Sequence, residues 1–214
     1  MNLNRSVELM VQRLQLNKGF PKYQFERSLD GFLSLFLVEF FSEIHLDQFV
    51  YVAAEFPMRK EKLQATDKET YQSTNVDYLL LRKGTCTQWY FVELKTDYAS
   101  ERDSQLQRLN SASGKPFSEF YNQIESIQKR SKREEKYERL LKNIDSHSTE
   151  SDRESEVHSI CLTNYTPRPP VTAAFNQVEW LKLSQFDANL KNTEHPELWR
   201  KVKILFEDTP QKAS

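Results

Sequence analysis

The stretch of residues 75–97 constrains the fold of this chain more than any other. It contains two apolar runs, 76–82 and 88–97, and the second is rich in aromatic and β-branched residues that favour strands. Gly84 lies in the short polar break between the two runs, which is a hairpin signal. The sequence therefore predicts two antiparallel strands joined by a tight turn.

Three charged side chains interrupt this apolar hairpin, and they are Asp77, Glu93 and Lys95. Glu93 and Lys95 are two residues apart, so a strand places them on one face. A three-residue loop at 84–86 puts Asp77 opposite Glu93 on that face, whereas a two-residue loop at 84–85 puts the two acids on opposite faces. Facing carboxylates repel unless a positive charge lies between them, and that charge is either a divalent cation or Lys95 alone.

An aspartate followed one hairpin later by Glu-x-Lys resembles the PD-(D/E)XK nuclease superfamily. The matching residues are Asp77 and Glu93-Leu94-Lys95, and Val76 stands where the family name has a proline. The likeness covers roughly residues 28–125. It implies an α/β, restriction-endonuclease-like fold, with a mixed β-sheet flanked by α-helices. The activity it implies is that of a metal-dependent nuclease that hydrolyses phosphodiester bonds.

The resemblance also implies roles for these residues. Asp77 and Glu93 would hold Mg²⁺ or Mn²⁺, with the backbone carbonyl of Leu94 as a further ligand, and hard oxygen donors suit both ions. Lys95 would orient or help to deprotonate the attacking water and offset charge in the transition state. The sequence therefore predicts a catalytic metal centre at the end of the second strand.

Further acids are candidates for the same centre. Residues 28–44 predict a largely buried helix with Ser28 as its N-cap, in which Glu39 would need a partner if it is buried. Glu43 is the competing acid one turn later, and the solvent face is an equal alternative for both. Glu55, near the end of a strand predicted at 49–58, is a candidate metal ligand or an exposed charge.

Gln105 is the remaining candidate, on a helix predicted at 100–111. Some members of the superfamily have a glutamine here and a tyrosine four residues later, where this chain has Leu109. Gln105 would orient a phosphate or a water, or it lies on the surface. The run 129–136 has five basic residues among eight and is a candidate phosphate contact, with a solvated helix face as the alternative.

The rest of the chain reads as part of the same domain, 1–214, with an N-terminal helix within residues 1–20 and a polar loop at 143–156. The other predicted elements are helices at 4–16, 117–144 and 196–207, strands at 157–165 and 177–183, and a polar loop at 59–74. No glycine-rich nucleotide loop and no metal-binding histidine spacing accompany them.

Composition limits the partners. The net charge of −1 argues against strong non-specific affinity for nucleic acid, although it allows a local basic face. Two cysteines do not make a disulfide framework, and no apolar segment has the length of a signal peptide or a membrane span, so we expect a cytoplasmic protein. The expected partner is nucleic acid, DNA before RNA. The alternative is a catalytically inactive nuclease-fold protein that acts as a binding module for another protein.

Overall fold

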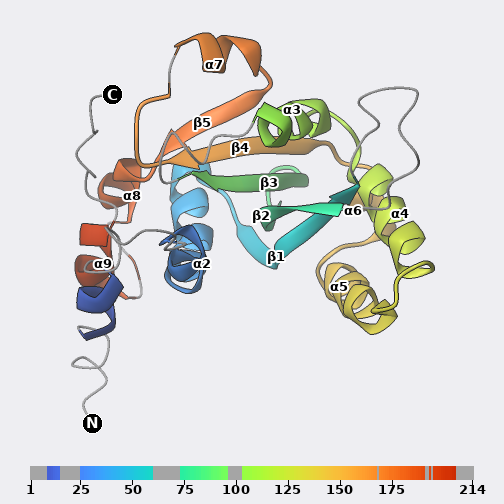
Figure 1. The fold of residues 1–214 in the computed structure, drawn as a ribbon, viewed down its shortest axis with the longest axis horizontal. Helices are drawn as coiled ribbons and strands as arrows, with labels where there is room; N and C mark the ends of the chain where they lie inside the picture. The colour runs from blue at the N-terminus through green and yellow to red at the C-terminus, as the bar shows by residue number, and fades with distance from the viewer. Residues whose placement is uncertain are drawn as a thin grey trace.

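A five-stranded sheet in the order β1-β2-β3-β4-β5 forms the centre of the molecule (Figure 1). The computed structural model describes residues 9–14, 25–59, 73–95, 103–167, 169–190, 193 and 195–205. The strands are β1 (Phe49–Arg59), β2 (Ser73–Arg82), β3 (Gln88–Lys95), β4 (Val157–Thr163) and β5 (Val178–Lys182). The first three pair antiparallel, and β3, β4 and β5 pair parallel, so the sheet is mixed.

Helices cover both faces of this sheet. Their bounds are α2 (Phe25–His45), α3 (Asp103–Ala112), α4 (Phe117–Gln128), α5 (Glu134–His147), α6 (Glu150–Arg153), α7 (Pro169–Ala174), α8 (Ser184–Asn189) and α9 (Pro196–Val202), followed by the 3-10 turn η2 (Lys203–Leu205). The core on one face joins α2, α8 and α9, and the core on the other joins α3, α4 and α5. The prediction of a restriction-endonuclease-like α/β architecture, a mixed sheet flanked by helices, is confirmed. None of the described helices has the length and apolar content needed to span a bilayer.

The first face is built on the aromatic stripe of α2. Phe36, Phe40 and Phe41 are fully buried there, and Phe40 stacks on Phe186 of α8 with 3.7 Å between ring centroids. The helix begins at Phe25, so Ser28 lies inside it and the prediction of Ser28 as N-cap is wrong. Leu35, expected in the apolar stripe, is 48% exposed, so α2 keeps one face in solvent.

The turn between β2 and β3 has the predicted length. Arg82 pairs with Gln88, so the loop comprises residues 84–86 and the three-residue register is confirmed. Asp47, between α2 and β1, holds this turn: its Oδ2 accepts hydrogen bonds from Arg82 Nε at 2.7 Å and from Thr85 Oγ1 at 2.6 Å. These bonds hold the pKa of the Asp47 carboxyl well below its usual range. A Cβ on Gly84 would lie 1.5 Å from Asp47 Oδ1, so any other residue here would have to displace the Asp47 carboxylate.

Two predictions about the middle of the chain are wrong. The helix expected at 117–144 is divided into α4 and α5 by a turn at 129–133, where Ser131 Oγ accepts a hydrogen bond from the Arg133 backbone N–H in place of a helix carbonyl. The loop expected at 143–156 contains the end of α5 and all of α6. Thr149 and Asp152 form a capping box there, with Thr149 N donating to Asp152 Oδ2 at 2.8 Å.

The chain ends are described in part. Residues 9–14 are helical, as predicted for 4–16, with Val11 and Leu14 buried and Met10 47% exposed. Most of the loop predicted at 59–74, the predicted helix cap at Ser100 and the end of the predicted strand at Asp97 lie outside the described residues. The short helix α8 was not expected from the sequence.

Candidate functional site

Asp77 lies at the point where the β2–β3 pairing ends. The last Cα pair is Tyr78 with Val92, and the next positions along the two strands are Asp77 and Glu93. Asp77 Oδ2 accepts a hydrogen bond from the backbone N–H of Leu94 at 2.7 Å. This carboxylate therefore takes the place of a β2 backbone carbonyl and is held against the last residues of β3.

Glu93 and Lys95 form an ion pair that is almost completely buried. Lys95 Nζ lies 2.7 Å from Glu93 Oε1, and the two residues are 2% and 3% exposed. Alternation along β3 puts both on the face of Trp89 and Phe91, which belong to the core with α3 and α4. Glu93 and Lys95 therefore lie on the side of the sheet covered by α3, and Asp77 contacts the backbone of Leu94 between them.

Beside this pair, the two strands β1 and β2 twist so that side chains two residues apart face opposite sides of the sheet. Tyr78 belongs to the core on the α2 side, whereas Val76, two residues earlier, belongs to the core on the other side. Glu55 lies between the partners of these two residues and has a φ of 54°, an uncommon conformation for a residue with a side chain. Its carboxylate is exposed and accepts a hydrogen bond from the Asn75 amide, so Glu55 lies across the ladder from Asp77 but is turned to Asn75.

The structure places the acids of α2 elsewhere. That helix packs on the face opposite to the Glu93 and Lys95 side chains. Glu39 is half-buried on it and Glu43 is exposed. The fold therefore does not gather these acids with the buried pair on one face, and a role for either one stays a prediction.

Helix α3 contributes a residue that the sequence analysis did not consider. Gln105 is half-buried on α3, and Arg108, three residues later, is half-buried as well. Burial lowers the pKa of the Arg108 guanidinium, and the charge of Glu93 opposes that effect. Lys95 pairs directly with Glu93, and the charge of the same carboxylate favours the protonated form of Arg108. The sequence signal that could have identified Arg108 was its position three residues after Gln105, because residues with this spacing are neighbours on a helix.

The oxygen donors of this site suit a small divalent ion. Magnesium is commonly held by one or two carboxylates and waters, and Asp77 and Glu93 supply two. The N–H and C=O of one residue in a strand face the same edge, so the Leu94 carbonyl is directed to the edge where its N–H meets Asp77. Among the described residues no group of three or more His, Cys, Asp or Glu is arranged to hold a metal. The two carboxylates and the Leu94 carbonyl stay a predicted donor set.

Comparisons of the chain with protein-family models, curated proteins and solved structures find no match.

A second polar cluster lies at the other end of β3, on the α2 side. Tyr90 packs between the rings of His45 and His158, with centroid distances of 5.5 and 5.2 Å. His158 Nε2 lies 2.6 Å from Glu179 Oε2 on β5. The spacing of these histidines in the sequence gives no metal-binding motif. The fold brings them together because β4 pairs parallel with β3 and β5 and α2 packs beside β1.

This second cluster makes stability depend on pH. Burial lowers the pKa of His45, with Arg82 and His158 acting in the same direction and Glu179 and Asp47 opposing it. The folded state therefore favours neutral His45, and as pH falls through 6.5, the usual pKa of a histidine, the unfolded chain binds the proton first. The hydrogen bond with His158 lowers the pKa of Glu179. The contribution of Glu179 to the free energy of unfolding is therefore present above pH 4.5 and is lost progressively below it.

We expect the free energy of unfolding, measured with urea, to fall as pH decreases from about 7 to about 5.5. In His45→Phe, whose ring keeps the contacts with Phe41, Phe49 and Tyr90, this part of the pH dependence should disappear. An unchanged slope in the variant would show that another group is responsible.

Proposed function

We propose that the protein is a metal-dependent nuclease that hydrolyses phosphodiester bonds of nucleic acid, with DNA as the expected substrate and the cytoplasm as its expected location. A single arrangement supports this proposal: Asp77 is bound to the backbone of Leu94, next to the buried pair of Glu93 and Lys95. Two acids and a lysine at the end of neighbouring strands are the groups that the resemblance to PD-(D/E)XK nucleases requires.

Each residue has a chemical task in this proposal. Asp77, Glu93 and the carbonyl of Leu94 would hold Mg²⁺ or Mn²⁺, which supplies Lewis-acid activation of water and of the phosphoryl group when bound. Lys95 holds its ammonium against Glu93, where it orients a water and balances the charge that develops on the phosphoryl oxygens. Arg108 is a further donor for a phosphoryl oxygen, since guanidinium groups bind phosphate in a bidentate manner.

Gln105 is placed on α3 to orient a phosphate or a water in the same way, and Glu39 and Glu55 are the candidates for outer positions around the ion. Glu39 lies on the helix that packs on the other face of the sheet, Glu55 is turned to Asn75, and Gln105 is only half-buried on α3. They rank below Asp77, Glu93 and Lys95 for these reasons.

One observation favours a second function, a nuclease-fold protein that binds a partner without catalysis. Glu93 and Lys95 are both more than nine-tenths buried and already satisfy one another at 2.7 Å. Such a pair also serves as a structural element that needs no metal ion. Binding of Mn²⁺ separates the two functions, because only the nuclease needs the ion.

Substitution Asp77→Ala tests the nuclease proposal. We expect cleavage of plasmid DNA with Mg²⁺ or Mn²⁺ to fall by about 100-fold or more, since the metal loses a ligand and Leu94 loses its hydrogen bond. The matched control is Glu154→Ala, which removes an exposed carboxylate after α6 and should cleave at the wild-type rate. Single-stranded DNA and RNA are assayed in parallel to identify the substrate.

Two results would contradict the proposal. Equal cleavage by wild type and Asp77→Ala would assign the activity to a contaminating nuclease. The absence of both cleavage and calorimetric Mn²⁺ binding in the wild type would favour the binding module.

A further inference from the structure

Basic side chains gather on the turn between α4 and α5 and along α5. Residues 129–142 include seven basic and three acidic residues, a net charge of +4 in a chain whose net charge is −1. All seven basic side chains are exposed, and we call them the α4–α5 basic surface: Lys129, Arg130, Lys132, Arg133, Lys136, Arg139 and Lys142. The remaining chain has an excess of acid, so the charge of the molecule is concentrated in one region.

The acidic residues of the same segment neutralise only part of this surface, because residues 129–142 include seven basic and three acidic residues. The helix dipole stabilises Glu134 in the first turn of α5. The pair of Lys142 with Glu138 is exposed on both sides, 73% and 49%, and surface pairs of this kind contribute little.

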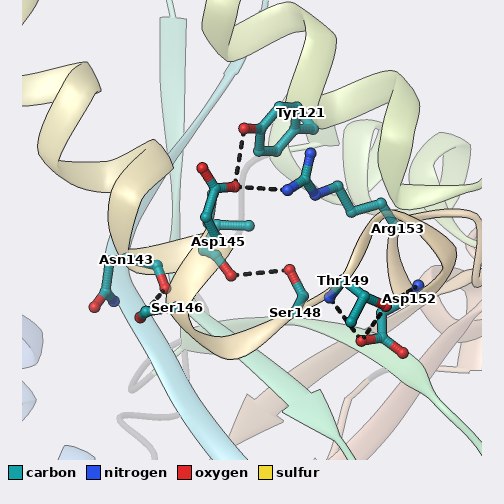
Figure 2. A network of polar contacts seen from close by, with 9 residues as sticks. Tyr121, Asn143, Asp145, Ser146, Ser148, Thr149, Asp152 and Arg153 are labelled. Carbon is teal, nitrogen blue, oxygen red and sulfur yellow. Dashed lines mark hydrogen bonds and ion pairs between the residues drawn. The ribbon is translucent and has the colours of Figure 1, made fainter.

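A polar network holds the basic surface in place. Figure 2 shows Tyr121 of α4 and Arg153 of α6 converging on Asp145 of α5. Tyr121 Oη donates to Asp145 Oδ1 at 2.9 Å, Arg153 Nη2 donates to the same oxygen at 2.7 Å, and the guanidinium lies 4.0 Å from the centre of the Tyr121 ring. Three helices are thus tied together, and the charge of Asp145 is matched by Arg153 instead of opposing the basic surface.

The chemistry of this surface fits a phosphate backbone better than a membrane or a protein. A helix that binds a membrane surface exposes large apolar side chains, and a protein interface usually offers aromatic anchors. The exposed large apolar residues of the described part of the chain are Leu9, Met10, Leu35 and Leu46, all far from α5 in sequence. Tyr137, the aromatic residue of α5, packs against the core.

We propose that the α4–α5 basic surface binds the phosphate backbone of nucleic acid without sequence specificity. This inference deepens the proposed function, because it names a surface that holds the substrate outside the reacting centre. Helices α4 and α5 cover the same face of the sheet as the side chains of Glu93 and Lys95. Figure 1 shows them together at one end of the molecule, opposite α8 and α9.

The test is binding of a fluorescent DNA duplex by anisotropy, in buffer with EDTA so that no cleavage occurs, over a series of salt concentrations. The variant is Lys132→Glu/Arg133→Glu, in two exposed residues of the turn. The matched control is Arg13→Glu/Arg200→Glu, which makes the same change of charge with exposed residues of the opposite face. We expect the turn variant to weaken binding about tenfold near 0.1 M salt and to reduce the salt slope by about 2, whereas the control changes little.

Other outcomes overturn the inference. Equal weakening by both double variants would mean that only total charge matters. Binding of wild type to phosphatidylglycerol vesicles but not to DNA would assign the surface to membranes. The failure of the nuclease proposal is distinguishable from this. If Asp77→Ala and wild type bind DNA equally and neither cleaves it with Mg²⁺, DNA binding by the basic surface is supported and the nuclease proposal is contradicted. If the turn variant binds and cleaves DNA like wild type, the nuclease proposal is supported and DNA binding by the basic surface is contradicted.

Discussion

Lys95→Met is expected to lower the free energy of unfolding by about 3–5 kcal/mol, the usual loss when one partner of a buried ion pair is removed. Glu93 is 2% exposed and its Oε1 lies 2.7 Å from Lys95 Nζ, so the variant leaves a carboxylate in the core without that cation. Glu93 then favours its protonated form in the folded state. The unfolded chain loses that proton more readily, so the deficit should be larger at about pH 8 than at about pH 5.

The control is the double variant Glu93→Leu/Lys95→Met, which removes both charges and keeps apolar volume. Replacing a buried pair in this way is often neutral or stabilising by about 1–4 kcal/mol, so the double variant should be more stable than the single one. Urea unfolding measures both. If the two variants were destabilised equally, the loss would come from packing of the lysine stem and not from the charge. Under the proposed function, both variants lose cleavage, whereas only the single variant loses stability.

Phe117→Ala is expected to lower the free energy of unfolding by about 3–5 kcal/mol, because it leaves a cavity in the core that joins α3, α4 and α5 to the sheet. Phe117 is fully buried, and its ring stacks on Trp89 with 3.7 Å between centroids and 11° between planes. Phe56 and Phe91 contact the same ring. The side chain therefore joins the first turn of α4 to the two strands β1 and β3, which is why the loss should exceed that of most core substitutions.

Phe117→Leu is the matched control, since it keeps most of the volume and removes the ring. It should lose about 1–2 kcal/mol. Chemical denaturation followed by tryptophan fluorescence measures both variants. A loss below about 1 kcal/mol in Phe117→Ala would mean that the neighbouring rings close the cavity, and the packing would then be softer than the structure indicates.

The sheet was the part of the structure most open to prediction from sequence. Alternation along 88–95 placed Glu93 and Lys95 on one face, and Gly84 in a short polar break gave the loop. The structure confirms the register because Arg82 pairs with Gln88. These signals are local, so a reader of the sequence can find them. The helix break at 129–133 is also a local feature. Its charged residues are equally compatible with the solvent face of one continuous helix, so the sequence alone does not show the break.

The remaining features depend on contacts distant in sequence. The change of face near Asp77 depends on the positive φ of Glu55, and no sequence pattern predicts that conformation. Arg108 lies near Glu93 only because α3 packs on β4 and β5. The capping box at Thr149 and Asp152 was an exception, because a Thr-x-x-Asp motif was visible in a segment interpreted as a loop. Burial of Glu93 and Lys95 was likewise a property of the assembled layers.

Asp47 gives the hairpin a fixed length. It contacts the turn through Arg82 and Thr85, and a side chain at Gly84 would have to displace the Asp47 carboxylate. An insertion or deletion of one residue in this turn would separate the tip from Asp47 and also move Asp77 to the other side of the ribbon. A change of turn length would therefore separate Asp77 from Glu93, whereas a substitution of the same length would leave their register intact.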